Sequence, residues 1–313
     1  MVEERIMRVA AIDCGTNSIR LLIADIEGNS FREVLRTMEI VRLGQGVDKT
    51  GEFHPDAIAR TLAAVDLFAA EIARKGVEKI RFCATSATRD AKNRHLFIDG
   101  VKERLGITPE VISGEEEAAL SFAGAIQNLP EEDGPFLVVD IGGGSTEFVF
   151  GRTKVEFAKS VNIGCVRMTE RHFIQNPAGA QEIESARSDI QAAIKVAASI
   201  VPITTAKTLI AVAGTATTVA AAALDLPEYD RYSIHGSRIS AQKTHEVCDQ
   251  FLTMTREERL QLAYMHPGRV DVIAAGSLVL SEIMKATGAQ EFIASESDIL
   301  DGMAWSIVER SAR

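Results

Sequence analysis

The sequence predicts an α/β fold of two domains, and three observations lead to this prediction. Short apolar runs of strand length alternate with longer segments whose apolar residues recur at helical spacing. A strand, turn and strand at 8–26 have a counterpart at 136–151, which indicates a duplicated domain. A stretch of prolines, acidic residues and glycine at 128–135 separates the two halves and is typical of a linker.

The first domain is expected to span 1–129. His54-Pro55-Asp56 is typical of a helix start, apolar residues follow at helical spacing as far as Ile72, and Gly76 is suited to end that helix. Apolar runs predict the strands of this domain, and two further segments are predicted to be helices. The predicted strands are 8–13, 19–26, 31–43, 79–84 and 110–112, and the predicted helices are 55–75, 93–105 and 115–126.

The second domain is expected to span 130–297, and a C-terminal helix of about 298–313 is expected to pack back on the first domain. Strand-length apolar runs here alternate with long alanine-rich segments that favour helices. The predicted strands are 136–141, 146–151, 154–161 and 208–213, and the predicted helices are 181–201, 215–224 and 272–286.

Composition narrows the class of protein. The 313 residues are 46% hydrophobic and 25% charged, which is enough for two domains of roughly 100–200 residues, each with its own core. The net charge of −10 gives no general attraction for polyanions, so no nucleic-acid partner is expected and any phosphate site must gather its positive groups locally. No apolar run approaches the ~18 residues of a bilayer span, and the N-terminus lacks a signal-peptide pattern, so we expect a cytoplasmic protein without a membrane partner.

The four cysteines are scattered and form no C-x-x-C pair, so neither a zinc site nor a disulfide framework is indicated. Cys14, inside the first glycine turn, is interpreted as a small buried side chain rather than a nucleophile. The sequence leaves the oligomeric state open, a homodimer included.

Two glycine turns carry the strongest chemical signal. In each, an apolar strand ends in a carboxylate, Asp13 or Asp140, and a turn of glycines and hydroxyl residues follows. Glycines let the backbone approach a ligand, and bare N–H groups with neighbouring hydroxyls can converge on an anion. The predicted phosphate-binding residues of these turns are Gly15, Thr16, Asn17 and Ser18, and Gly142, Gly143, Gly144, Ser145 and Thr146.

Neither turn is one of the commoner nucleotide motifs. A P-loop requires a lysine and a following helix, and a Rossmann loop also opens a helix. Here no lysine follows the glycines, and residues 147–150 continue as a strand. The pair of turns therefore indicates two clamps on one phosphate-rich ligand.

Five segments resemble the Ppx/GppA exopolyphosphatase and guanosine pentaphosphate phosphohydrolase family, in the family's order along nearly the whole chain. They are DCGTNSIRLLIADI at 13–26, TSATRDAKNR at 85–94, SGEEEA at 113–118, DIGGGSTE at 140–147 and AGTATT at 213–218. That family is part of the actin, Hsp70 and sugar-kinase superfamily. The resemblance therefore implies two ribonuclease-H-like domains, each a mixed sheet flanked by helices, with the active-site cleft between them.

Acid–base chemistry is expected from the glutamates of SGEEEA. On the residues alone, three carboxylates at a helix start also fit capping and stabilisation of the helix dipole. The resemblance places the family's catalytic base at Glu117, with Glu116 as the alternative. Adjacent helix positions point about 100° apart, so only one of the two is expected to face the cleft.

Positive charge at the site is expected from a metal ion and an arginine. Asp13, Asp140 and Glu147 are hard oxygen ligands suited to Mg²⁺, and the resemblance implies magnesium dependence with Asp140 and Glu147 as ligands. Arg89 is the candidate for contacting the substrate phosphate, although an ion pair with Asp90 or a helix cap explains it equally well from the residues.

A third glycine and hydroxyl turn, Gly214 and Thr215, follows the strand at 209–213, and its helix would direct its N-terminus at the ligand. Arg269, in an R-x-D element with Asp271, is expected to form a structural ion pair.

The resulting hypothesis is a Mg²⁺-dependent exopolyphosphatase that removes terminal orthophosphate. Larger family members carry further C-terminal domains, and this chain stops at Arg313, so short polyphosphate chains are the expected substrate. The close alternative is hydrolysis of guanosine pentaphosphate, pppGpp, at its 5′ end. Two other classes stay open: an ATP-dependent kinase of the same superfamily, which the Glu-Glu-Ala motif disfavours, and a sensor that binds polyphosphate or (p)ppGpp without turnover.

Overall fold

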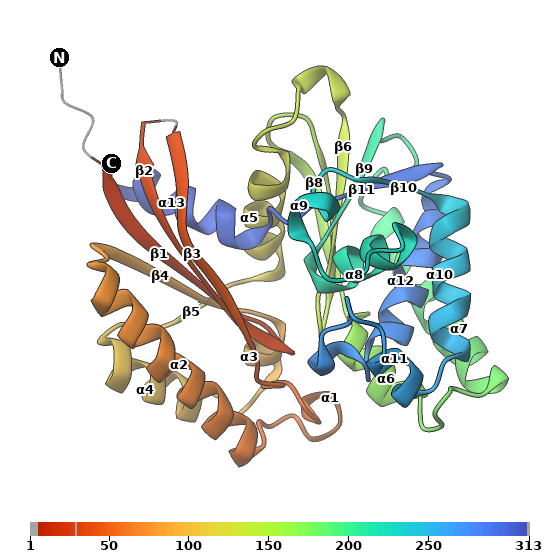
Figure 1. The fold of residues 1–313 in the computed structure, drawn as a ribbon, viewed down its shortest axis with the longest axis horizontal. Helices are drawn as coiled ribbons and strands as arrows, with labels where there is room; N and C mark the ends of the chain where they lie inside the picture. Colours follow the sequence, from red (N-terminus) through yellow and green to blue (C-terminus); the bar gives the residue numbers. More distant parts are fainter. Residues whose placement is uncertain (1–5, 29, 312–313) are drawn as a thin grey trace. The chain divides into compact units, whose positions relative to one another are not determined.

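The computed structural model describes residues 6–28 and 30–311. They form two compact units: one comprises the residues up to Leu120 and those from Ile299 onward, and the other is Ser121–Asp298 (Figure 1). Each unit has a mixed β-sheet flanked by helices, which confirms the predicted fold class.

The first unit contains a five-stranded sheet in the order β3-β2-β1-β4-β5. Strand β2 is antiparallel to both of its neighbours, β1 and β3, whereas β4 and β5 run parallel to β1. The strands are β1 Met7–Cys14, β2 Ser18–Glu27, β3 Ser30–Ile40, β4 Lys79–Ala84 and β5 Glu110–Val111, and the helices are α1 Val47–Thr50, α2 Pro55–Lys75, α3 Ser86–Asp90, α4 Arg94–Leu105, α5 Gly114–Ile126 and α13 Ile299–Ser311.

Successive side chains along each strand point to opposite faces of this sheet, and both faces are apolar. Ile12 and Leu21 pack with Phe68 of α2 and Phe97 of α4 in one buried cluster. Their sequence neighbours, such as Leu22, point to the other face, where they pack with residues of α13. The C-terminal helix α13, blue in Figure 1, thus packs on β1, β2 and β4.

The second unit contains a six-stranded sheet in the order β10-β11-β9-β6-β7-β8. Five of these strands, β8-β7-β6-β9-β11, repeat the order and the directions of the first sheet, as a duplicated domain requires. The strands are β6 Phe136–Ile141, β7 Thr146–Gly151, β8 Val155–Val161, β9 Thr208–Val212, β10 Arg238–Ser240 and β11 Glu291–Ala294, and the helices are α6 Cys165–His172, α7 Ala180–Ala198, α8 Ala213–Ala223, α9 Arg231–Ile234, α10 Ala241–Thr253, α11 Arg256–Leu260 and α12 Ile273–Thr287. Two short 3₁₀ turns lie at Glu131–Asp133 and Pro267–Arg269.

The division between the units falls inside α5, at Leu120, and not at 129/130 as the linker composition predicts. The reason is that the proline- and glycine-containing segment is anchored to the second unit. Lys207 Nζ donates to the Glu132 carbonyl at 2.6 Å, and Thr208 Oγ1 donates to the Asp133 carbonyl at 2.7 Å. A segment of linker composition is therefore part of a folded domain.

Several elements are not predicted from the sequence, among them α6, α10 and β11. β11 has only four residues and α6 only eight, so neither is long enough to establish a period in the sequence. None of the helices in the described part of the chain combines the length and the apolar character that a bilayer span requires.

A substitution at Gly302 tests how closely α13 packs in the first unit. A Cβ added to Gly302 would lie 2.0 Å from the carbonyl oxygen of Leu120. Within a helix, Gly→Ala usually raises the free energy of unfolding by about 1 kcal/mol. At Gly302 we expect the opposite, a decrease of about 1–3 kcal/mol, because the opposing backbone atom cannot rotate away from the new Cβ. Urea denaturation measures the change.

Gly100 on α4 provides the matched control for Gly302. A Cβ there would meet the methyl groups of Leu62 at 2.6 and 2.9 Å, and these can turn away. We expect Gly100→Ala to stay close to the wild type in stability. Equal stability of the two variants would contradict the packing described for α13.

Candidate active site

The first glycine turn joins β1 to β2 and is closed by a hydrogen bond from Gly15 N to Ser18 O at 2.9 Å. Its carbonyls are held by a second segment: Gly44 N donates to Thr16 O at 2.9 Å, and Arg42 N donates to Asn17 O at 2.8 Å. In a trans peptide unit the carbonyl and the N–H point in opposite directions. The Asn17 N–H therefore faces away from the 41–44 segment, as ligand binding by the turn requires.

The second glycine turn joins β6 to β7 and has the same construction, with Gly142 N donating to Ser145 O at 3.0 Å. The N-terminal end of α6 holds its carbonyls. Cys165 N donates to Gly142 O at 2.9 Å and Val166 N donates to Gly143 O at 2.9 Å. The N–H groups of Gly143 and Gly144 consequently face away from α6.

Two residues that the sequence analysis did not identify support this second turn. Gly164 lies so close that a Cβ would be 2.3 Å from the Gly143 carbonyl. Arg167 is buried, and its Nε donates to the Gly144 carbonyl at 2.7 Å. No local pattern marks either residue, because their role depends on a contact some 20 residues away in the sequence.

The hydroxyl and amide side chains of the turns have different roles. Thr16 Oγ1 and Asn17 Oδ1 are buried polar atoms without a hydrogen-bond partner in the described structure, so both have capacity for a ligand. Ser145 is buried. Thr146, predicted as an additional donor to phosphate, instead donates its proton to the Ile163 carbonyl at 3.0 Å, so its hydroxyl holds the turn together.

The carboxylates that end the two strands have different cross-strand neighbours. Asp13 lies opposite Arg20, whose Nη2 contacts Asp13 Oδ2 at 2.6 Å. Asp140 lies opposite Glu147, so these two carboxylates share one face of β6 and β7. Asp140 and Glu147 are 6% and 0% exposed, and each accepts a hydrogen bond from a serine hydroxyl, Ser121 and Ser160 respectively.

Two neighbouring buried carboxylates repel each other when both are ionised. A divalent cation relieves this repulsion, and Asp140 and Glu147 supply the oxygen ligands that Mg²⁺ prefers. Within residues 6–28 and 30–311, no cluster of three or more His, Cys, Asp or Glu side chains is arranged to hold a metal ion. Mg²⁺ is commonly bound through one or two carboxylates, with water and substrate oxygens as its other ligands.

The predicted acid–base residues lie at the start of α5. Ser113 caps this helix, because its Oγ accepts a hydrogen bond from Glu116 N at 3.1 Å. Glu117 is buried and contacts Arg89, whose Nη1 lies 2.6 Å from Glu117 Oε2. Arg89 also donates to the Ile112 carbonyl at 3.1 Å. The structure therefore brings together two residues predicted separately for the site.

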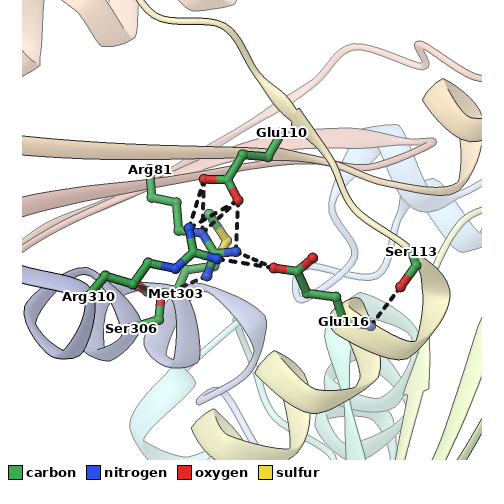
Figure 2. Close-up of polar contacts among 7 residues, drawn as sticks. All are labelled: Arg81, Glu110, Ser113, Glu116, Met303, Ser306 and Arg310. Atoms are coloured by element: carbon green, nitrogen blue, oxygen red, sulfur yellow. Dashed lines mark hydrogen bonds and ion pairs between the residues drawn. The ribbon is translucent and has the colours of Figure 1, made fainter. Parts of the chain in front are cut away.

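Glu116 points to a different set of partners (Figure 2). Its Oε1 lies 2.5 Å from Arg81 Nη2 and 3.3 Å from Arg310 Nη2. The two adjacent glutamates therefore have different partners: Glu116 pairs with Arg81 and Arg310, whereas Glu117 pairs with Arg89.

The third turn differs from the prediction. Helix α8 begins at Ala213, which has φ 67°, so Gly214 and Thr215 lie within its first turn and not before it. Arg269 packs on Gly214: a Cβ at Gly214 would lie 2.5 Å from Arg269 Cζ, and Arg269 Nη1 donates to the Gly214 carbonyl at 3.2 Å. Arg269, expected in an ion pair with Asp271, supports this turn, while Asp271 Oδ1 lies 2.7 Å from Arg256 Nε.

The cysteines near the turns are unsuited to nucleophilic chemistry. Burial, together with the charge of Asp13, raises the pKa of the Cys14 thiol well above its ordinary value. Burial likewise raises the pKa of Cys165, at the start of α6. Both thiols therefore stay protonated and unreactive near neutral pH.

The contact of Gly164 with the second turn leads to a prediction. We expect Gly164→Ala to push α6 away from Gly143 and to lower the free energy of unfolding by about 1–3 kcal/mol, because the opposing atoms are backbone. Gly179, which precedes α7 as Gly164 precedes α6, is the control. The nearest atoms to a Cβ at Gly179 would be those of the flexible Gln175 side chain, from 3.3 Å, so Gly179→Ala should be tolerated. Thermal unfolding compares the two, and an equal melting temperature would contradict the role of Gly164.

Comparisons with known proteins agree with this arrangement. The model of the Ppx/GppA phosphatase family matches residues 22–311. Exopolyphosphatase 2 of Mycobacterium tuberculosis is 46% identical over 313 residues, which cover 96% of this chain and 98% of the relative. A solved exopolyphosphatase-like protein is 43% identical with a TM-score of 0.95, covering 98% of this chain and 99% of that one. The Aquifex aeolicus member of the family is 31% identical with a TM-score of 0.81, covering 99% and 100%. The chain belongs to the Ppx/GppA phosphatase family.

Proposed function

We propose that this chain is an exopolyphosphatase, which hydrolyses the terminal phosphoanhydride bond of inorganic polyphosphate and releases orthophosphate. The observation that carries the proposal is the Glu117–Arg89 pair at the start of α5, which combines a buried carboxylate with a guanidinium at 2.6 Å. Support also comes from the full-length similarity to Exopolyphosphatase 2 of Mycobacterium tuberculosis.

In this proposal Glu117 is the general base. It accepts a proton from a water molecule whose oxygen attacks the terminal phosphorus, and the bond from that phosphorus to the bridging oxygen breaks. The products are orthophosphate and a polyphosphate chain one unit shorter, which carries the released negative charge. Arg89 orients Glu117, and its planar fork of donors is suited to contact the oxygens of the transferred phosphoryl group.

Each glycine turn, taken by itself, is proposed to bind phosphate oxygens. The N–H groups of Asn17, Gly143 and Gly144 face away from the segments that hold the carbonyls, and backbone amides need no reorganisation when an anion binds. Thr16 Oγ1 and Asn17 Oδ1 add polar capacity in the first turn, Oδ1 as an acceptor from a phosphate-bound water or a protonated oxygen.

A divalent cation is proposed at Asp140 and Glu147, and Mg²⁺ suits these ligands best. When bound, the metal would neutralise charge on the phosphate oxygens. Asp13, the third predicted ligand, is paired with Arg20, so its role is proposed to be the orientation of that arginine beside the first turn.

Short polyphosphate chains are the proposed substrate. The net charge of −10 gives the protein no extended attraction for a long polyanion, so binding depends on the few local donors described above. A terminal phosphoanhydride is also present in pppGpp, which makes this nucleotide the competing substrate in the test.

Phosphate release from short polyphosphate, long polyphosphate, pppGpp and ATP tests the proposal. We expect release from polyphosphate with Mg²⁺, fastest with short chains, and loss of release when EDTA removes the metal. Faster release from pppGpp would assign the nucleotide as substrate instead. Binding of one of these compounds with no release from any would contradict enzymatic function and indicate a sensor.

Glu117→Gln tests the assigned base. The substitution keeps the size of the side chain and removes its ability to accept a proton, so kcat should fall by about 10²- to 10⁴-fold while the protein stays folded. Steady-state kinetics with tripolyphosphate measures this. Glu115→Gln, an exposed carboxylate on the same helix turn, is the control and should keep wild-type turnover.

A further inference from the structure

Four charged side chains form a closed network in the first unit (Figure 2). Arg81 of β4 is at the centre with only 3% of its side chain exposed, and it donates to Glu110 of β5 at 2.9 Å and to Glu116 of α5 at 2.5 Å. Its Nη1 donates to Ser306 Oγ of α13 at 2.7 Å. Arg310, also on α13, contacts the same two carboxylates at 3.2 and 3.3 Å.

The charges of this network balance, two guanidinium groups against two carboxylates. Burial, the largest influence on Arg81, disfavours its charged form, but its hydrogen bonds and charge interactions with Glu110 and Glu116 raise its pKa above the ordinary value. Burial also acts against the ionised form of Glu110, and the contacts with Arg81 and Arg310 nevertheless lower its pKa. Arg81 and Glu110 are therefore charged at neutral pH, and loss of a carboxylate would leave the buried Arg81 charge with one partner fewer.

The network determines how α5 is oriented about its own axis. Glu116 and Glu117 are adjacent, so they point about 100° apart on the helix. Arg81 holds Glu116 on one side, and Arg89 holds Glu117 on the other. Rotation of α5 in either direction would break one of the two ion pairs.

We propose that Glu116, held by Arg81, is a positioning residue that keeps Glu117 in place for proton transfer. This inference rests on the proposed role of Glu117 as the base. Neither Glu116 nor Arg81 touches the substrate in this account, and both act only through the orientation of α5. The network also makes the C-terminal helix α13 part of the support of the base, through Ser306 and Arg310.

Glu116→Gln tests the proposal, because this side chain is 40% exposed and its replacement is less disruptive than that of buried Arg81. A small displacement of a reacting group lowers the rate strongly, so we expect kcat to fall about 10- to 100-fold. KM should stay within about twofold of the wild type, because the glycine turns are untouched. Arg310→Gln, which removes an exposed partner of the same carboxylates, should lower kcat in the same direction by a smaller factor.

Arg36→Gln separates positioning from general loss of stability. Arg36 of β3 contacts Asp301 of α13 at 2.6 Å and so also anchors this helix, at a residue outside the four-residue network. We expect Arg36→Gln to lower the melting temperature. At temperatures where this variant is still folded, its kcat should equal that of the wild type. A kcat for Glu116→Gln that equals the wild type at the same temperature would overturn the proposal.

The double variant Glu116→Gln/Glu117→Gln shows whether Glu116 acts through Glu117. If it does, adding Glu116→Gln to Glu117→Gln causes little further loss, because the base it positions is already absent. If the factors by which the two single substitutions lower kcat multiply in the double variant, the proposal is overturned. If Glu117→Gln retains turnover, Glu117 is not the base. If, in addition, Glu116→Gln alone abolishes turnover, Glu116 is the base.

Discussion

The candidate site depends on the way the carbonyls of the two glycine turns are held. In each unit a second segment, 41–44 or 164–167, donates backbone N–H groups to the turn carbonyls and so orients the peptide units. Without these donors a glycine-rich turn has many accessible conformations, and ordering it on ligand binding would cost conformational entropy. Because the turns are held in advance, the phosphate binding that we propose for them would need little rearrangement.

The two units repeat one topology but differ in chemistry at equivalent positions. The strand-end aspartate of the first unit lies opposite Arg20, whereas that of the second unit lies opposite Glu147. The first unit therefore supplies a guanidinium beside its turn, as well as the Glu117–Arg89 pair. The second unit supplies two carboxylates suited to a cation. Two units of one topology thus carry different charged groups at equivalent positions.

The sequence predicted the features whose signal is local. Both turns, their strands and the helix that carries Glu117 follow from apolar runs, glycines and caps within a few residues of each other. The supports of the turns, Gly164, Arg167 and Arg269, act on residues some 20 to 55 positions away, and a single sequence contains no sign of such contacts. The different partners of Glu116 and Glu117 likewise cannot be predicted from the sequence, because Arg81 and Arg89 lie some 28 to 35 positions away.

In our proposal the glycine turns bind phosphate, and Glu117 is needed for hydrolysis but not for binding. Calorimetric titration of the Glu117→Gln variant with tripolyphosphate, with and without Mg²⁺, tests this separation most directly. We predict Mg²⁺-dependent binding at micromolar to millimolar concentrations, in the usual range of enzyme substrates, together with loss of turnover in the same sample. Unchanged turnover, or the absence of binding by the folded variant, would contradict the account.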